Sequence, residues 1–455
     1  MLTGREYEVS LLHTYYKKNG STISVVYGQK GVGKTTLLRF FSKEVGGAYF
    51  YEARSCSDRE QRIQWGMELS RKGHDLPSLA EYDMLLEASR LSAGKGNEKR
   101  VIIINEFQHL LKSDSIFMHK LMDFMHYHQS NFPCMVLLCS SDTGWVENQM
   151  LLSIRDFAGA IDGLLKVKCL KYFDMKKLYP EFSDSECLLA YSVLGGYPEL
   201  WSYFERSKPV KDNLIEMLLH RNGPLYHRIR GNITEKLREP AVYNTILCTL
   251  AAGNEKLNDI HERTRYSRAK ISVYLKNLIE LNIVEKVYSF ESAGYRNVQK
   301  GVYRIIDPYV KFYYKYLFPN MSDFYEMDGN EFYLKHIAPG ISTDLENTYC
   351  KICKEKINKH YKSVEEWYGK SGIIPIVAVD RNQRVTVCFC SLEKKLTSKE
   401  YDMFLSLLNK AKIQADTIIL FSEKGFEEHL PDVTRNTPVL YQSIFVNGEE
   451  NKYIE

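Results

Sequence analysis

Residues 23–41 read ISVVYGQKGVGKTTLLRFF, and this stretch decides the fold of the N-terminal third. Its first five residues are mostly apolar and β-branched, which predicts a buried strand. A glycine-rich loop comes next, followed by an amphipathic run that predicts a helix. Glycines at 28 and 33 let the backbone approach a polyphosphate, and amide N–H groups at the helix start point at it. The order strand, glycine loop, helix therefore predicts a phosphate-binding loop.

The loop also contains residue types suited to phosphate and metal. Lys34 supplies a point charge and is a candidate catalytic residue, and the hydroxyl of Thr35 is a candidate magnesium ligand. We expect the ligands of this site to be ATP and Mg2+. The candidate binding residues are Gly28, Gln29, Lys30, Gly31, Val32, Gly33, Lys34, Thr35 and Thr36, with Ser141 from a later strand. The alternative is a glycine turn that only packs.

A second part of the predicted site follows the apolar run at residues 101–104, which is typical of a strand buried in a parallel sheet. The run ends in Asn105 and Glu106. Glu106 is the candidate base that deprotonates an attacking water. Asn105 is a candidate metal-shell residue, but its amide carries no charge, which predicts weaker metal binding and slower turnover. The alternative for Glu106 is an acid at the start of a helix over 106–112.

A third apolar strand is predicted at residues 134–139, and it ends in Ser140 and Ser141. In sheets where this strand lies between the strand before the glycine loop and the strand at residues 101–104, a hydroxyl at its end lies beside the γ-phosphate. The alternative is that the two serines only cap the next turn. Residues 48–52 and 164–170 are further strand candidates. Five strands alternating with helices predict an α/β fold with a doubly wound parallel sheet.

These segments, together with residues 4–6 (GRE) and 195–200 (GGYPEL), resemble the archaeal-type ATPases of the P-loop class related to the AAA+ and STAND groups. The resemblance extends over nearly the whole chain. It implies a P-loop ATPase core, a helical lid, a winged helix-turn-helix and an α/β domain similar to PD-(D/E)XK nucleases. Family members usually have Asp at position 105 and Arg at position 160, where this chain has Asn and Ala. Arg155 is a candidate substitute, and a surface arginine is the alternative.

The resemblance and the residue pattern together divide the chain into five predicted segments. The segments are an ATPase core at 1–170, a helical lid at 171–238, a winged helix-turn-helix at 239–305, an aromatic helical arm at 306–340 and a nuclease-like domain at 341–455.

The winged-helix prediction is based on three helical segments, 242–252, 257–263 and 267–281, followed by a hairpin. Basic residues lie on the predicted recognition helix (Arg268, Lys270 and Lys276) and on the predicted wing (Arg296 and Lys300). Residues 255–300 hold nine basic and six acidic side chains, which is a modest excess. Double-stranded DNA is therefore a candidate partner, and packing or contact with a protein partner is the alternative.

The arm contains aromatic residues at helical spacing. Tyr309, Phe312, Tyr313 and Tyr316 recur at i, i+3, i+4 and i+7, which predicts one side of a helix. A buried stripe is favoured over a base-stacking platform, because such platforms usually present exposed aromatic residues on a sheet.

The last hundred residues lack the charges that the resemblance would require for a nuclease. Glu346 stands on a predicted helix, but Pro375, Phe389 and Ser391 replace the acids and the lysine of the nuclease pattern. Metal-assisted phosphodiester cleavage needs those charges, so we expect a degenerate domain kept for structure or binding. Cys350, Cys353, Cys388 and Cys390 predict buried thiols, with zinc as the alternative.

Composition limits the class of protein. The chain has 455 residues, 26% of them charged and 44% hydrophobic, with a formal net charge of +4. These values are typical of a folded globular protein rather than a disordered or membrane-embedded one, and we expect a cytoplasmic location.

The first functional hypothesis is a slow ATPase that acts as a nucleotide-dependent regulatory switch coupled to the winged helix. The second is a non-hydrolysing, ATP-stabilised DNA-binding or protein-interaction adaptor, and an ATP-dependent nuclease ranks third.

Overall fold

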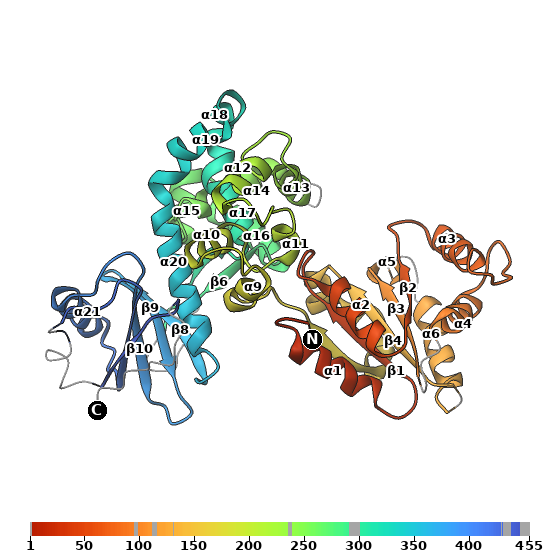
Figure 1. The fold of residues 1–455 in the computed structure, drawn as a ribbon. Helices are drawn as coiled ribbons and strands as arrows, with labels where there is room; N and C mark the ends of the chain where they lie inside the picture. Colours follow the sequence, from red (N-terminus) through yellow and green to blue (C-terminus); the bar gives the residue numbers. More distant parts are fainter. Residues whose placement is uncertain are drawn as a thin grey trace. The chain divides into compact units, whose positions relative to one another are not determined.

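The computed structural model describes residues 2–94, 99–111, 116–130, 132–234, 239–290, 301–428, 430 and 438–445. The chain folds into two compact units, which are coloured along the sequence in Figure 1. Unit 1 comprises Met1–Leu170 with the short stretches Tyr197–Glu199 and Glu280–Asn282, and unit 2 comprises the remainder.

Unit 1 is built on a parallel five-stranded sheet with strand order β2-β3-β4-β1-β5. The strands are β1 (Thr22–Tyr27), β2 (Ala48–Glu52), β3 (Arg100–Asn105), β4 (Cys134–Ser140) and β5 (Ile161–Lys166). This confirms the predicted fold class, although β5 begins earlier than the predicted segment. The three central strands β3, β4 and β1 are almost completely buried, because helices cover both faces and only apolar strands are stable there. β4 separates β3 from β1, as expected for the strand that precedes Ser141.

Helices flank both faces of this sheet, with α1 and α2 packed together on one face and α4 and α6 on the other (Figure 1). Aromatic and aliphatic side chains fill the core between α3, α4, α6 and the sheet, and Trp65 stacks on Tyr51 at 4.1 Å between ring centroids. The helical elements are α1 (Glu6–Tyr16), α2 (Lys34–Glu44), α3 (Asp58–Ser70), α4 (Tyr82–Ser92), α5 (Gln108–Leu111), α6 (Ile116–Tyr127), α7 (Thr143–Trp145), the π-helix η1 (Val146–Met150), α8 (Leu151–Ile154) and the 3-10 helix η2 (Arg155–Ala160).

Unit 2 begins with helices and contains the predicted winged helix-turn-helix. Three helices, α14 to α16, precede the antiparallel pair β6–β7, which matches the predicted order of elements. The first elements of the unit are α9 (Tyr172–Leu178), α10 (Asp184–Leu194), α11 (Pro198–Trp201), α12 (Val210–Met217), α13 (Pro224–Thr234), α14 (Pro240–Ala251), α15 (Leu257–Thr264), α16 (Arg268–Glu280), β6 (Val284–Val287) and β7 (Val302–Ile305).

A run of helices then leads to a second sheet. The helical elements are α17 (Pro308–Phe312), the π-helix η4 (Tyr313–Leu317), the 3-10 helix η5 (Phe318–Asn320), α18 (Met321–Glu326), α19 (Gly329–Phe332), the π-helix η6 (Tyr333–Ile337) and α20 (Ala338–Ile357). All four residues of the predicted aromatic stripe are buried, which confirms the structural role of that stripe. Within the described residues, no helix combines the length and apolar character needed to cross a bilayer.

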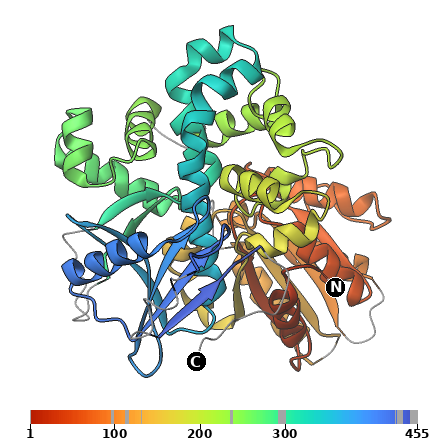
Figure 2. The same ribbon diagram turned by 60° about the vertical axis from the view of Figure 1, so that its left-hand side comes forward.

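The second sheet has strand order β12-β11-β10-β9-β8 and mixes parallel with antiparallel pairs. Its elements are β8 (Ser363–Gly369), β9 (Gly372–Val379), β10 (Val385–Ser391), α21 (Ser398–Ala411), β11 (Thr417–Ser422) and β12 (Val439–Gln442). Val387 and Phe389 of β10 pack toward α21. Cys388 and Cys390 alternate with these two residues along β10 and therefore lie on the other face of the sheet, where α20 packs. Helices α20 and α21 thus cover opposite faces of the sheet (Figure 2).

Candidate functional site

The glycine loop between β1 and α2 has a backbone that other residues would disturb. A Cβ atom on Gly28 would lie 2.2 Å from the carbonyl oxygen of Val167. Gly33 has a φ of 96°, a left-handed conformation that glycine adopts without strain, and α2 begins directly after it at Lys34. The predicted loop residues 28–33 thus form a tight turn that ends at a helix N-terminus, where backbone N–H groups have no partner within the helix.

Lys34 lies in the first turn of α2 and its side chain folds back into the loop. It is only 7% exposed, and its ammonium group donates to the carbonyl oxygens of Gly28 at 2.7 Å and Gln29 at 3.1 Å. Burial lowers the pKa of Lys34, while nearby acids, including Glu106 and Glu52, oppose that shift. Thr35 and Thr36 are exposed on the same turn, and Lys30 is exposed in the loop. The structure therefore brings residues 28–36 together at one turn, and their role in phosphate binding stays a prediction.

Arg5, from the GRE segment, fixes the loop from outside. Its guanidinium group is buried and donates to the carbonyl oxygens of Val32 at 2.6 Å and Lys168 at 2.7 Å, and it pairs with Glu8 at 2.9 Å. Charged donors to carbonyl oxygens form strong hydrogen bonds where water is excluded. Arg5 thus links the loop to the segment that follows β5.

Glu106 adopts a strained conformation directly after β3. Its φ is 50°, which is uncommon for a residue with a side chain and is often found at functional sites. One carboxylate oxygen accepts from the hydroxyl of Ser141 at 2.8 Å, the backbone N–H of Ser141 at 3.3 Å and the side-chain amide of Gln108 at 2.5 Å. Helix α5 begins two residues later. The helix thus starts two residues later than predicted, and the carbonyl oxygen of Glu106 accepts from the N–H of His109 at 3.0 Å, so both interpretations of Glu106 stay predictions.

Asn105 ends β3 beside Glu52, which ends β2. The side-chain amide of Asn105 donates to the Glu52 carboxylate at 2.7 Å. A cavity of about 310 Å³ opens next to this pair, and its lining includes Thr35, Arg39 and Glu68. The structure thus brings both predicted metal-shell residues, Thr35 and Asn105, to one cavity, together with the two carboxylates of Glu52 and Glu68.

Sequence reasoning missed the role of Glu52 at this edge. A signal was available, because Glu52 is the last residue of a predicted strand and the carboxyl ends of neighbouring parallel strands meet at the same edge of a sheet. Gln108 was also missed. Its contact with Glu106 depends on the turn after β3, and the sequence does not reveal that turn.

Two other predicted residues lie near the end of unit 1. Residues 155–160 form η2, so Ala160 directly precedes β5. The side chain of Arg155 lies outside the part that the structure describes, so its suggested role as a substitute arginine stays a prediction.

In the winged helix, α16 buries one side and exposes basic residues on the other. Ile271, Leu275 and Leu278 are buried, whereas Arg268, Lys270 and Lys276 are exposed. The side chain of Ser267 accepts from the backbone N–H of Lys270 at 3.2 Å, which caps the start of α16. Arg296 and Lys300 fall outside the described residues.

The nuclease-like positions of the second sheet make structural contacts. Both carboxylate oxygens of Glu346 accept from the backbone N–H of Leu392 at 3.1 Å. Phe389 packs on Phe404 with ring centroids 5.1 Å apart. The hydroxyl of Ser391 donates to the carbonyl oxygen of Lys394 at 3.0 Å. Pro375 lies within β9, in line with the sequence expectation.

The four cysteines considered for zinc are packed between α20 and the second sheet. Cys353, Cys388 and Cys390 are buried, Cys350 is partly buried, and all four are free thiols. Burial raises the pKa of Cys388 and Cys353, which favours the protonated form over the thiolate that binds zinc. Within the described residues, no group of three or more His, Cys, Asp or Glu side chains is arranged to hold a metal ion.

Comparison with known proteins places two modules on the chain. Residues 2–204 match a family described as an ATPase domain predominantly from Archaea. Residues 244–286 match a family described as a bacterial regulatory protein of the arsR family. The second match covers most of α14, all of α15 and α16, and the first residues of β6.

Individual proteins are similar to this chain over most of its length. An uncharacterised protein of Methanocaldococcus jannaschii is 24% identical over 401 residues, which cover 84% of this chain and 85% of that protein. A Walker-type ATPase of Pyrococcus abyssi matches with a TM-score of 0.49 and 18% identity, over 69% of this chain and 95% of the other. The ORC2 protein of Aeropyrum pernix matches with a TM-score of 0.43 and 15% identity, over 67% of this chain and 90% of the other. The chain thus carries an archaeal-type, nucleotide-binding ATPase domain followed by a winged helix-turn-helix of the arsR type.

Proposed function

We propose that this protein binds ATP with Mg2+ at the glycine loop of unit 1, hydrolyses it slowly, and uses the nucleotide state to regulate the winged helix. One observation supports hydrolysis above the others. Glu106 is held in a left-handed conformation with its carboxylate bonded to Ser141. Strained backbone conformations are found mostly at functional sites, and the hydrogen bond from Ser141, which follows β4, holds the Glu106 carboxylate in place. Both features favour a chemical role for Glu106 over a packing role.

The residues at the loop fit a nucleotide triphosphate and its magnesium ion. Gly28 leaves no room for a side chain, Gly33 starts α2 in a left-handed turn, and Lys34 provides a buried positive charge. Thr35 would hold the metal through its hydroxyl, and Asn105 would hold a metal-bound water through its amide oxygen. The metal, when bound, would neutralise part of the negative charge of the triphosphate.

Each chain residue then has a defined task. Lys34 would exchange the carbonyl oxygens of Gly28 and Gln29 for phosphate oxygens, because an anion is a stronger acceptor than a neutral carbonyl group. Glu106 would take a proton from the attacking water. The Ser141 hydroxyl, which donates to Glu106, would turn toward the γ-phosphate when ATP is bound. The bond between Glu106 and Ser141 is thus a candidate sensor of nucleotide state.

Slow turnover follows from the pair at the ends of β2 and β3. Asn105 carries no charge, and its amide is engaged by the carboxylate of Glu52. Glu52 supplies a negative charge at the same cavity, which partly compensates for the missing carboxylate at position 105. We expect metal binding to be retained but weaker than with an acid at that position.

The alternative function, an ATP-stabilised adaptor without hydrolysis, is favoured by Asn105 and Ala160. In either case, the exposed basic residues of α16 and the arsR-type match support contact of this module with double-stranded DNA. The nuclease-like interpretation of residues 341–455 remains a proposal. The contacts of Glu346, Phe389 and Ser391 support a role in structure rather than in cleavage.

The test is ATP turnover by the full chain, its Asn105→Asp variant and its Lys34→Ala variant. We expect Asn105→Asp to raise turnover by up to about tenfold, because a charged acceptor forms hydrogen bonds about twice as strong. We expect Lys34→Ala to remove measurable turnover. Wild-type binding without turnover, unchanged in Asn105→Asp, would favour the adaptor, and absence of ATP binding would contradict both functions.

Contact with DNA is tested separately by titrating a duplex oligonucleotide at several salt concentrations, with and without ATP. If the protein is a nucleotide-dependent switch, its affinity for the duplex should fall with increasing salt and should differ between samples with and without ATP. Binding that is insensitive to salt would remove DNA as the partner, and binding that is insensitive to ATP would remove the switch.

A further inference from the structure

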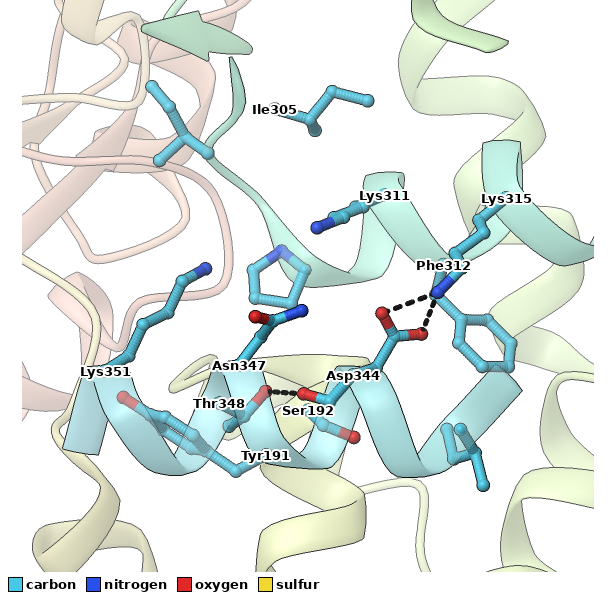
Figure 3. Close-up of a pocket in the computed structure, with 13 residues that line it drawn as sticks. Tyr191, Ser192, Ile305, Lys311, Phe312, Lys315, Asp344, Asn347, Thr348 and Lys351 are labelled. Atoms are coloured by element: carbon cyan, nitrogen blue, oxygen red, sulfur yellow. Dashed lines mark hydrogen bonds and ion pairs between the residues drawn. The ribbon is translucent and has the colours of Figure 1, made fainter. Parts of the chain in front are cut away.

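An open recess lies within unit 2, between segments of the lid, the arm and the C-terminal domain. Helices α10, α17 and α20 and the end of β7 form its walls (Figure 3). Its volume is about 50 Å³. The polar and charged side chains of the lining are Tyr191, Ser192, Lys311, Lys315, Asp344, Asn347, Thr348 and Lys351.

The recess carries a surplus of positive charge. Asp344 is the acid of the lining, and it is fully engaged: Lys315 donates to both of its oxygens at 2.6 and 2.7 Å, and the Tyr316 hydroxyl donates at 2.6 Å. Lys311 and Lys351 form no ion pair or hydrogen bond with any side chain in the described part of the chain. Three lysines face one acid, which leaves two positive charges without a partner.

The charges beyond the lining do not remove this surplus. Glu255 and Glu366 both pair with Arg304, at 2.7 and 2.6 Å. Glu285 also acts on Lys351 through its charge, but it is exposed to solvent on β6. Solvent screens such an exposed charge, so its effect on the recess is weak.

Lys311 and Lys351 are close enough to affect each other. Surrounding protein lowers the pKa of Lys351, and the positive charge of Lys311 lowers it further. In Figure 3 both side chains extend toward the space beside Asn347, from α17 on one side and α20 on the other. Two like charges near each other repel, and because Lys351 is exposed on α20, solvent weakens this repulsion as it weakens the attraction of Glu285. An anion between them would relieve this repulsion.

The size and chemistry of the recess define the anion. One water needs about 10–15 Å³ of such space, so the recess, about 50 Å³ in volume, holds a group of about four or five heavy atoms, and the rest of a ligand can extend through its open side. Two ammonium groups and the Asn347 amide provide point-charge and hydrogen-bond donors suited to phosphate oxygens. We propose that this recess binds the terminal phosphoryl group of a small phosphorylated molecule, and that the bound group joins the lid, the arm and the C-terminal domain of unit 2.

The first experiment measures the acetylation rate of each lysine in the full chain with a neutral N-hydroxysuccinimide ester, read by mass spectrometry. We expect inorganic phosphate to slow acetylation of Lys351 and Lys311 at least about fivefold, since charge-assisted bonds cover both amines. Lys356, an exposed lysine on the same helix, should not respond. Equal slowing of Lys356, or an equal effect of chloride at matched ionic strength, would overturn the proposal.

A second arm separates the sources of phosphate. A duplex oligonucleotide without terminal phosphates should give no protection of Lys351; protection by the duplex alone would overturn the proposal in favour of a nucleic-acid backbone. Lys311→Met should weaken phosphate protection of Lys351 by about tenfold, which corresponds to one charged hydrogen bond. Lys356→Met is the matched control. If Lys311→Met disturbs folding, Asn347→Leu provides a second variant, because Asn347 is exposed on a helix. If phosphate protects Lys351 equally well in a folded variant of either kind, the assignment is contradicted.

Discussion

The two sheets of this protein are similar in size but differ at the positions where chemistry is expected. In the first sheet, strands β3 and β4 lead to Glu106 and Ser141, whose side chains bond to each other and lie near a buried lysine. In the second sheet, strands β9 and β10 carry Pro375 and Phe389, and the remaining acid, Glu346 on the neighbouring helix α20, is bonded to a backbone N–H group.

The difference concerns which polar groups are left for a ligand. The first sheet is parallel throughout, so its strands end together and place polar side chains around one helix N-terminus. The second sheet mixes strand directions, and the polar candidate residues in and beside it bond to backbone groups. A nucleotide site is therefore expected in unit 1, whereas the second sheet is expected to support structure.

The largest effect is expected for Glu106→Gln. Loss of the base should lower ATP turnover by about 10²- to 10⁴-fold. ATP affinity should stay within about threefold, because glutamine keeps an oxygen that accepts from Ser141. Turnover and equilibrium binding are measured on the same preparation, with Asp83→Asn on the exposed side of α4 as the control. Turnover that survives Glu106→Gln would show that another group acts as the base.

Gly28→Ala is expected to reduce stability. The new methyl group would meet the Val167 carbonyl oxygen at 2.2 Å, and overpacking of this kind costs about 1–3 kcal/mol. Urea unfolding monitored by circular dichroism measures the loss. Gly159→Ala is the matched control, since nothing lies within 4 Å of its added atom. Equal stability of the two variants would contradict the close approach at Gly28.

A smaller effect is expected at Glu346 in α20, the helix that packs on the second sheet. Glu346→Ala removes the acceptor for the Leu392 N–H group and should cost about 1–2 kcal/mol of unfolding free energy. Asp402→Ala on the exposed side of α21 is the control. Plasmid nicking by the wild type with Mg2+ or Mn2+ that disappears in Glu346→Ala would show that this sheet has kept nuclease chemistry.

Local sequence patterns predicted the parts of the site that lie close together along the chain. Lys34 and Thr35 were found because the strand, glycine loop and helix follow one another without interruption. The buried aromatic stripe around Phe312 was found because helical spacing reports one side of a helix.

The remaining features depend on tertiary contacts. The left-handed backbone of Glu106 is fixed by Ser141, 35 residues away, and no local propensity indicates it. The pairing of Glu52 with Asn105 requires the strand order of the sheet. The recess with Lys311 and Lys351 exists only where helices from three distant segments pack together.

The central claim is that the triphosphate of ATP is held by the glycine loop of unit 1 and not by the lysines of unit 2. The most direct test is the dissociation constant of ATP with Mg2+, measured by calorimetry for the wild type, Lys34→Ala and Lys311→Met. We expect Lys34→Ala to weaken binding by about 10- to 100-fold, equivalent to a lost charged hydrogen bond, and Lys311→Met to change it less than about twofold. Lys43→Ala, an exposed lysine at the other end of α2, should match the wild type. Binding that survives Lys34→Ala but is lost in Lys311→Met would contradict the claim.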